Sequence, residues 1–386
     1  MPPQIVVLGS GYAGAGAIQR LESEFPNDAD ITWISASDYH LVLHESHRCI
    51  RNPNVRETIT IPIEEIKDPS TDFIQAHAED VDTDDRVVVL EDDRTVEYDY
   101  LLVAIGSQTS FFGIQGLEEY AHTVEGIEDV LGIHEDLKAA SQAATPAEPA
   151  QVVIGGAGLS GIQTAGEVAE FRDERDAPID IHLVEGLDSI FPNNDPDVQS
   201  ALRTRLERLD VNIMTGEFIS KVDEDTVYVG DEELEYDVLV WTGGITGQDL
   251  LSKVEVTKDE RSHRLNAGMN FQTDDDRVFA IGDCALIEQS GDAPAPPTAE
   301  AAWDAADHVG KNIARYIRGE PLEKWSFKSK GTAISVGEDA VAHDVQYIPV
   351  DTFGGYAAKV IKKAIAARWI ASITGLGRAL KAWPHM

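Results

Sequence analysis

The sequence predicts an α/β protein with two Rossmann-like, doubly wound dinucleotide-binding domains and a C-terminal amphipathic helical module. A strand, a glycine-rich loop and a helix follow one another near residue 9, and the same pattern returns near residue 156. The third observation is the tail: six Lys or Arg and no Asp or Glu follow Asp351. A chain of 386 residues is long enough for two or three domains.

The charge of the chain narrows the range of partners. The formal net charge is −38 although the last 35 residues carry +6, so the first 351 carry about −44. Acidic residues prevail along almost the whole chain, which favours adaptation to a high-salt cytoplasm, where the Debye length falls to about 3 Å. An acidic face for a basic partner is the alternative. No nucleic-acid partner is expected, because phosphate binding needs a basic footprint.

The first loop stands in "QIVVLGSGYAGAGAIQRLE". An apolar strand, Ile5–Leu8, leads into Gly9, Gly11 and Gly14, and a helix follows. The three glycines permit a tight turn, close approach to a diphosphate, and helix–strand packing, in that order. The diphosphate would sit at the helix N-terminus. In the next strand Ser35 stands where a ribose-binding Asp or Glu is typical, and a serine can make one such hydrogen bond.

The second loop stands in "AQVVIGGAGLSGIQTAGEVAE". A strand, Val152–Ile154, precedes Gly156, Gly158 and Gly161. Glu185, 29 residues beyond Gly156, ends the next predicted strand. Its carboxylate can accept both ribose hydroxyls and would repel a 2′-phosphate, so this loop favours NAD(H) over NADP(H). The alternative is that one of the two loops only packs a helix against a sheet.

Three further segments complete an ordered set. "DDRVFAIGDCA" places Gly282 and Asp283 after a buried strand, and "YDYLLVAIGSQ" and "YDVLVWTGG" are apolar strands that end in glycine turns. Together the five motifs resemble the two-dinucleotide flavoproteins related to glutathione reductase over nearly the whole chain. The resemblance implies FAD at the Gly9 loop, Asp283 at the ribitol and phosphate side of the flavin, and NAD(P)H at the Gly156 loop.

Four segments and the basic tail point to one branch of that superfamily. Phe111–Leu137, Asp38–Leu43, Pro296–Gly319 and Lys330–Ala342 resemble type II NADH:quinone oxidoreductases. The resemblance implies transfer of hydride from NADH to FAD, then of two electrons to a membrane quinone, without proton pumping. It implies a cytoplasmic protein held peripherally on the inner face of the cell membrane.

The resemblance also implies the residues that contact the two cofactors, FAD and NADH. These are Gly9, Gly11, Tyr12, Ala13, Gly14, Ser35, Val81, Ala104, Gly106, Gly282, Asp283, Ala299, Gly156, Gly158, Gly161, Glu185 and Gly243.

The sequence departs from the type II pattern at the residues expected to handle protons. Gln163 replaces the usual Glu on the second helix, and Glu300 and Asp304 replace two Gln at the quinone-site helix. Quinone reduction consumes two protons, and Gln163 cannot ionise. We therefore expect Gln163 and Glu300 to be the catalytic residues, with Glu300 as the acid. The same departures leave the identity of the acceptor open.

The cysteines and histidines leave alternatives. Cys49 and Cys284 are too few for a disulfide framework. Cys49 could serve a soluble NADH-dependent reductase of a thiol, a peroxide or a protein, although an inert thiol is favoured. A sulfide:quinone oxidoreductase is a further alternative, which the cysteine count disfavours because such enzymes need two or three cysteines around the flavin. The non-enzyme alternative is a flavin-bound protein that binds the membrane surface without turnover. His40, His44 and His47 match no zinc spacing, so no metal site is predicted.

The tail predicts a helix with an apolar stripe of Ile361, Ile365, Trp369 and Ile373. Leu376, Leu380 and Trp383 continue roughly the same stripe if the helix runs through Gly375 and Gly377. A basic amphipathic helix that carries Trp is typical of an interfacial membrane anchor, here over residues 356–383. Packing on the protein's own core or on a homodimer partner is the alternative. We expect no transmembrane helix and no signal peptide, because no apolar run reaches about 18 residues and the first strand starts at once.

These motifs predict the following domain organisation. The FAD-binding domain covers residues 1–114 and 246–325, and the NAD(H)-binding domain covers residues 115–245, with Lys138–Ala150 as a linker to its glycine-loop unit. Residues 326–386 form the C-terminal membrane or interface module.

Overall fold

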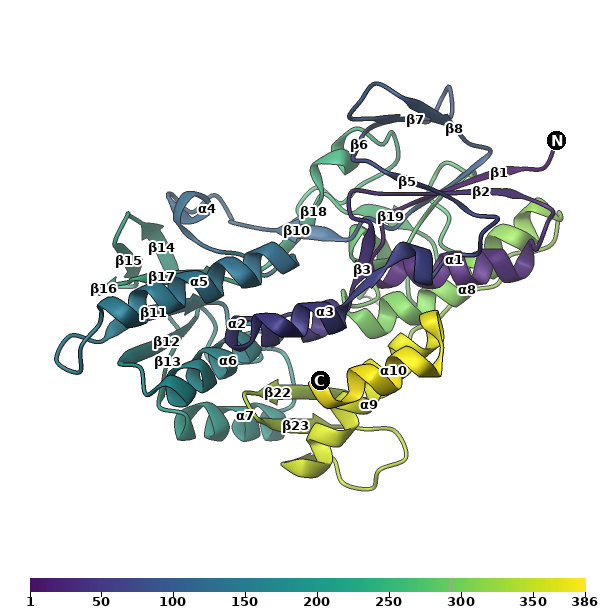
Figure 1. The fold of residues 1–386 in the computed structure, drawn as a ribbon. Helices are drawn as coiled ribbons and strands as arrows, with labels where there is room; N and C mark the ends of the chain where they lie inside the picture. The colour runs from purple at the N-terminus through teal and green to yellow at the C-terminus, as the bar shows by residue number, and fades with distance from the viewer. Residues whose placement is uncertain (292) are drawn as a thin grey trace.

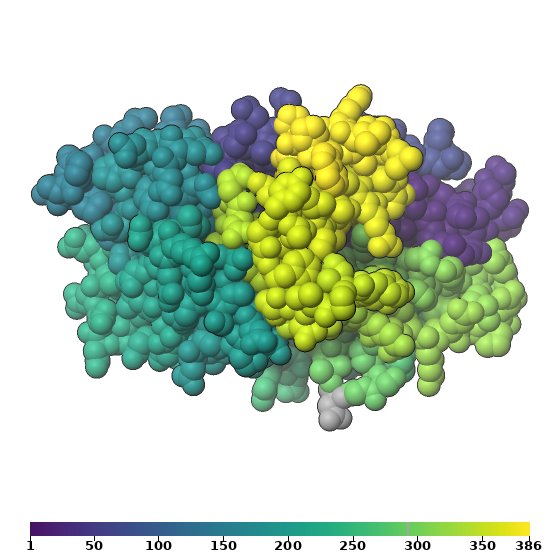
Figure 2. Space-filling model, turned by 90° about the horizontal axis from the view of Figure 1, so that it is seen from below, coloured from purple at the N-terminus to yellow at the C-terminus, as the bar shows by residue number. Residues whose placement is uncertain are grey.

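The computed structural model describes residues 1–291 and 293–386. Two α/β lobes lie side by side, and the C-terminal helices run beneath the junction between them (Figure 1). From below, the last residues of the chain occupy the middle of the surface, between the teal lobe and the purple and green lobe (Figure 2). The predicted fold class is confirmed.

The first lobe is built on a five-stranded parallel sheet in the order β20-β9-β1-β2-β5. Its strands are β1 (Gln4–Leu8), β2 (Asp30–Ser35), β5 (Asp72–Gln75), β9 (Tyr100–Val103) and β20 (Val278–Ala280). Helices α1 (Tyr12–Glu24) and α8 (Ala299–Ile317) pack together on one side of this sheet (Figure 1). Because the sheet is covered, its central strands are apolar on both faces.

The second lobe repeats this plan with a four-stranded parallel sheet in the order β13-β12-β11-β17. The strands are β11 (Ala150–Gly155), β12 (Ile179–Glu185), β13 (Val211–Thr215) and β17 (Val238–Trp241). Helices α5 (Ile127–Ala143), α6 (Leu159–Arg175) and α7 (Pro196–Arg208) surround it.

The linker expected over Lys138–Ala150 is wrong for its first half, because α5 continues to Ala143. Ala and Lys are strong helix formers, and buried Leu137 anchors this part of the helix on the core. The chain leaves the helix only at Ala144 and turns between Thr145 and Glu148.

Short elements complete the two lobes. The strands are β3 (Tyr39–Leu41), β4 (Thr60–Pro62), β6 (Ala78–Asp82), β7 (Val87–Leu90), β8 (Thr95–Glu97), β10 (Ser107–Thr109), β14 (Ile219–Val222), β15 (Thr226–Val229), β16 (Glu232–Glu235), β18 (Ile245–Gly247), β19 (Leu265–Ala267) and β21 (Ala285–Ile287). The helices are α2 (Arg48–Arg51), α3 (Arg56–Ile59) and α4 (Leu117–Tyr120). Strands β10 and β18 pair antiparallel where the chain passes between the lobes.

The C-terminal module consists of a small sheet and two helices. Strands β22 (Thr332–Val336), β23 (Asp339–His343) and β24 (Thr352–Gly354) form an antiparallel sheet, and α9 (Tyr356–Thr374) and α10 (Leu376–Ala382) follow. The two helices are separated at Gly375, whose φ of 90° ends α9. The predicted stripe could continue past this residue only in an unbroken helix, and the break at Gly375 shows that this condition is not met.

The face of α9 that packs on the protein overlaps the predicted stripe only in part. Trp369 and Ile373 are 1% and 4% exposed, and Lys362 is 4% exposed, whereas Ile365 is 41% exposed. The buried residues recur every three or four positions, so they form the face that packs on the body. The sequence misplaced this face because α9 carries apolar side chains on more than one side.

No helix in the described part of the chain is long and apolar enough to cross a membrane.

Candidate nucleotide-binding and proton-transfer site

The first glycine loop has the geometry that a diphosphate needs. Gly9 has a φ of 101°, and a Cβ there would collide with the carbonyl oxygen of Ala104. A Cβ at Gly14 would collide with the carbonyl oxygen of Gly9. At Gly11 a Cβ would meet nothing within 4 Å, and the start of α1 has no capping side chain. Open space and free backbone N–H groups therefore meet at one helix N-terminus.

The second glycine loop is built in the same way. Gly156 has a φ of 91°, and a Cβ there would lie 2.7 Å from Cα of Gly243. A Cβ at Gly161 would collide with the carbonyl oxygen of Gly156, whereas one at Gly158 would meet nothing within 4 Å. Both loops thus have the shape that a dinucleotide needs. The space over the second glycine of each loop is not explained by the alternative that one loop only packs a helix against a sheet.

The two ribose-side residues differ in how they are engaged. The carboxylate of Glu185 accepts hydrogen bonds from the backbone N–H of Ala157, at 2.8 Å, and of Leu187, at 3.0 Å. It is therefore fixed beside the second loop and keeps lone pairs for ribose hydroxyls. The hydroxyl of Ser35 instead donates to Oγ of Ser10 at 2.8 Å, so this serine braces the first loop.

Asp283 has the environment expected of a cofactor ligand. Arg264 donates from Nε to its backbone carbonyl at 2.7 Å, which fixes the turn. The carboxylate receives no hydrogen bond from any described residue, and burial raises the pKa of Asp283 against the effect of Arg264. Nearby, Gly282 has a φ of 75°, and a Cβ there would touch Cβ of Ala13 at 3.0 Å. An unpaired, half-buried carboxylate suits a ligand rich in hydroxyl groups.

The structure places the remaining predicted contacts as follows. Tyr12 is the first residue of α1, Ala299 is the first residue of α8, and Val81 is buried in β6. Gly106 has a φ of 72° in the turn after β9. Their contacts with the cofactors stay predictions.

Gln163 lies where three parts of the chain meet. Its Nε2 donates to Oγ of Ser335 in β22 at 3.1 Å, and that hydroxyl lies 2.9 Å from Nε2 of His47. The serine hydroxyl can accept from the amide nitrogen and at the same time donate to a neutral imidazole nitrogen. Burial holds the pKa of His47 well below its usual value, which is consistent with a neutral acceptor.

A buried ion cluster lies beside His47. Glu45 is fully buried. One of its carboxylate oxygens lies 2.5 Å from Nε of Arg48, and the other lies 3.5 Å from Nζ of Lys362. Burial opposes ionisation of Glu45, but Lys362 and Arg48 hold its pKa well below the usual range. His44 joins this cluster to the first loop, because its Nδ1 is hydrogen-bonded to the hydroxyl of Tyr12. The cluster combines acids and bases that can hold protons close to the predicted flavin site.

Glu300 lies in a different environment. Its carboxylate accepts a hydrogen bond from the backbone N–H of Lys330 at 2.9 Å, and burial raises its pKa. The ammonium of Lys330 reaches Asp304 at 3.3 Å. Gln163 and Glu300 are not hydrogen-bonded to each other and share no hydrogen-bond partner among the described residues. That Glu300 supplies the proton that Gln163 cannot supply therefore stays a prediction.

Sequence reasoning missed Glu167, which lies one helical turn beyond Gln163. It is fully buried, and burial raises its pKa to about 7. The only signal was its spacing, which puts both residues on one face of α6. From the sequence, His40, His44 and His47 were interpreted only as candidate metal ligands. Among residues 1–291 and 293–386 there is no group of three His, Cys, Asp or Glu that could hold a metal ion.

Comparison with known proteins assigns the chain to a family. A family model described as pyridine nucleotide-disulphide oxidoreductase matches residues 3–306 and therefore both glycine loops. The chain belongs to this family.

Relatives of this pyridine nucleotide-disulphide oxidoreductase carry a narrower name. Proteins named type II NADH:quinone oxidoreductase from Staphylococcus saprophyticus and Staphylococcus haemolyticus are 28% and 29% identical, and each alignment covers 98% of both chains. The resemblance to that group is confirmed.

Solved structures agree on the fold. NDH2 from Plasmodium falciparum, in complex with NADH, has a TM-score of 0.85 at 18% identity and covers 100% of this chain and 98% of its own. The sulfide:quinone oxidoreductase from Aquifex aeolicus has a TM-score of 0.83 at 20% identity and covers 96% and 91%. At these identities the likeness establishes the fold alone.

The oxidoreductase has no dithiol despite the family's name. Cys49 and Cys284 are both free and buried. Burial raises the pKa of each thiol to about 12, so neither is a ready nucleophile. This argues against the thiol-dependent alternatives.

Proposed function

We propose that this protein is a type II NADH:quinone oxidoreductase: it oxidises NADH through bound FAD and reduces a quinone at a membrane surface. One observation carries the proposal. Two glycine loops, each open over its second glycine, lie in a chain that aligns end to end with relatives of that name. When bound, FAD supplies the chemistry that accepts a hydride from NADH and releases two electrons to the quinone.

The residues of the chain bind and orient the two nucleotides. The first loop and Asp283 would hold FAD, and the second loop and Glu185 would hold NADH. Glu185 beside the loop disfavours a 2′-phosphate, so NADH is the proposed donor. The domain boundaries proposed from the sequence lie at about 114, 245 and 325. In support of them, the first sheet takes its strands from residues 4–103 and 278–280, and the second sheet takes its strands from residues 150–241.

Protons for the quinone would come from the buried groups next to the first loop. Lys362 and Glu45 form an ion pair, and His44 connects that pair to Tyr12. Burial lowers the pKa of Lys362 against the pull of Glu45, which makes its proton easier to give up than that of an exposed lysine. Glu300 remains the candidate acid at the start of α8, where the quinone would approach.

Attachment to the inner face of the membrane is proposed through α10 more than α9. Leu376 and Leu380 are each 74% exposed and Trp383 is 38% exposed. Lys381 stands beside them, whereas Arg378 is bound to Glu65. Apolar contact would supply most of the binding in molar salt, where charge attraction is screened. A homodimer that covers the same side chains is the alternative.

The function is tested under anaerobic conditions in molar KCl. NADH is added to the purified holoprotein, a quinone follows, and the flavin absorbance is recorded. Bleaching by NADH and recovery on addition of quinone are expected. Bleaching without recovery would reject the quinone as acceptor, and no bleaching would reject the NADH site.

A further inference from the structure

Helix α9 is connected to the first glycine loop by two hydrogen bonds that meet at the side chain of His40. Trp369 of α9 donates from its indole Nε1 to Nε2 of His40 at 2.8 Å. The other ring nitrogen of His40, Nδ1, lies 2.7 Å from the carbonyl oxygen of Ser10. Ser10 stands between Gly9 and Gly11. A residue near the end of the chain therefore reaches the loop predicted to bind FAD.

The direction of each hydrogen bond is fixed by the chemistry. An indole N–H can only donate, so Nε2 of His40 must be the acceptor. A neutral imidazole then carries its proton on Nδ1 and donates it to Ser10. Burial lowers the pKa of His40 to about 4, which keeps the ring neutral at physiological pH.

This chain of bonds orients the loop backbone. In a trans peptide the C=O and the N–H point in opposite directions, so anchoring the carbonyl of Ser10 turns the N–H of Gly11 away from His40. The hydroxyl of Ser10 is fixed as well, because it donates to the carbonyl of Tyr39 at 3.1 Å and accepts from Ser35. Successive oriented N–H groups are what binds a diphosphate.

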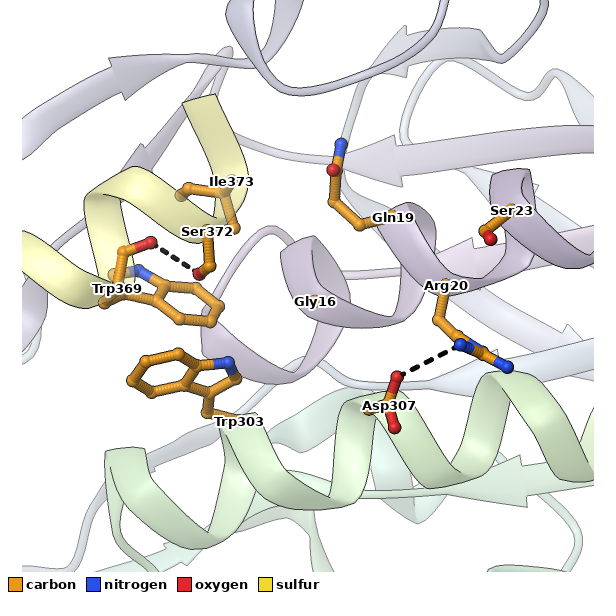
Figure 3. Close-up of a pocket in the computed structure, with 9 residues that line it drawn as sticks. All are labelled: Gly16, Gln19, Arg20, Ser23, Trp303, Asp307, Trp369, Ser372 and Ile373. Atoms are coloured by element: carbon orange, nitrogen blue, oxygen red, sulfur yellow. Dashed lines mark hydrogen bonds and ion pairs between the residues drawn. The ribbon is translucent and has the colours of Figure 1, made fainter. Parts of the chain in front are cut away.

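Packing holds Trp369 in this position. Its ring lies 4.7 Å from that of Tyr12 and 4.9 Å from that of Trp303 in α8. Figure 3 shows Trp369 above Trp303 and beside the α1 backbone at Gly16. A Cβ at Gly16 would lie 2.8 Å from Cβ of Ala306 and 3.6 Å from the Trp369 ring, so the glycine allows the three helices to close together.

We infer that Trp369, acting through His40, is a positioning residue for FAD, and that the C-terminal segment thereby holds the first glycine loop in its binding conformation. The inference rests on the proposed assignment of FAD to this loop. The inference gives α9 a role in retaining the cofactor, whereas membrane attachment is proposed mainly through α10.

Trp369→Phe tests the inference, because it keeps an aromatic ring and removes the N–H. The holoprotein is diluted stepwise in molar KCl without NADH, quinone or membrane, and released FAD is followed by its fluorescence. We expect the dissociation constant of FAD to rise about tenfold, because His40 loses the hydrogen bond that fixes the tautomer and orientation with which it anchors Ser10. Trp303→Phe removes an indole N–H from the same cluster without affecting His40 and should leave FAD affinity unchanged.

A second variant separates the hydrogen bond from general damage. His40→Asn keeps a donor near the position of Nδ1 but leaves no acceptor at the position where Nε2 of His40 meets Trp369. In that background Trp369→Phe should weaken FAD binding no further. Thermal unfolding followed by circular dichroism, together with the affinity for NADH at the second loop, shows whether each variant is folded.

Two outcomes would overturn the inference. Either Trp369→Phe retains FAD as tightly as the wild type, or Trp303→Phe releases FAD equally, which would assign the effect to ring packing. The wild-type response to NADH and quinone is a separate measurement. Its failure would reject the proposed function while the FAD dilution series still decides the role of Trp369.

Discussion

Glu167 and Arg51 lie together at the meeting point of three segments of the chain, with a carboxylate oxygen 3.1 Å from Nε of the guanidinium. The two groups are close, but neither oxygen of Glu167 has an aligned hydrogen bond. Arg51 also reaches Glu338 in the β22–β23 turn at 2.7 Å and Glu174 at 3.3 Å. The arginine thus links α2, α6 and the C-terminal module, and Glu167 is its most deeply buried partner.

Glu167→Gln should stabilise the protein at alkaline pH. Its pKa is raised from 4.5 to about 7 in the folded state, mainly by burial and against Arg51 and Arg48. The unfolded chain therefore loses this proton first, and stability is lost as pH rises from about 4.5 to 7. Removing the charge should recover up to about 3 kcal/mol at pH 8 and almost nothing at pH 4.5.

Thermal unfolding of both proteins at the two pH values, at constant KCl, measures this difference. Glu174→Gln is the matched control, because it also pairs with Arg51 but its side chain is 51% exposed. An equal gain at both pH values would show that the charge of Glu167 is not responsible.

Acidification should destabilise the fold before most carboxylates titrate. Burial lowers the pKa of His40 and of His44 from 6.5 to about 4. Between these values the unfolded chain binds protons that the folded chain does not, so stability falls as pH drops from 6.5 to 4. The maximum effect is about 3 kcal/mol for each histidine. His44→Asn should flatten the dependence of the melting temperature on pH, whereas His77→Asn, at an exposed position, should leave it unchanged.

Glu185→Gln should weaken NADH binding about tenfold, because the neutral amide keeps only one acceptor oxygen for the loop and the ribose. Fluorescence titration of the holoprotein with NADH measures the change, with FAD content as the internal check. Glu232→Gln, on exposed β16 of the same lobe, is the control. If NADH affinity were unaffected, Glu185 would only brace the second loop through Ala157 and Leu187.

Glu300→Gln should slow quinone reduction tenfold or more if this carboxyl supplies a proton, since general acids typically contribute about 10²–10⁴-fold. It should also remove one limb of the pH profile, while flavin bleaching by NADH stays unchanged. Asp307→Asn, one turn beyond Asp304 and paired with Lys311, is the control on the same helix. An unaltered turnover and pH profile would exclude Glu300 as the acid.

Leu376→Asp combined with Leu380→Asp should abolish vesicle binding in molar KCl. Both leucine side chains are exposed, and their apolar contact with lipid is the contribution to membrane binding that salt does not weaken. Co-sedimentation with anionic lipid vesicles measures binding, and NADH oxidation with a soluble dye should be retained. Ile365→Asp tests α9 separately. Retained binding of the double variant, or conversion of a dimer to a monomer, would favour a protein interface.

The fold class, the two glycine loops and the strands that lead into them could be predicted from the sequence. These features are local: glycine spacing, apolar runs and a carboxylate at a strand end, such as Glu185, follow from a few neighbouring residues. The carboxylate of Glu185 lies beside the second loop because β11 and β12 are parallel neighbours, so their carboxyl ends meet at one edge of the sheet.

Only the tertiary structure shows where the tail and the histidine-rich stretch pack. Helix α9 has apolar residues on several sides, so periodicity did not reveal that Trp369 and Lys362 face the protein. His40 and Trp369 are 329 positions apart, and Gln163 and Ser335 are 172 apart. Such pairs arise from the packing of distant segments, and no pattern within either segment specifies the partner.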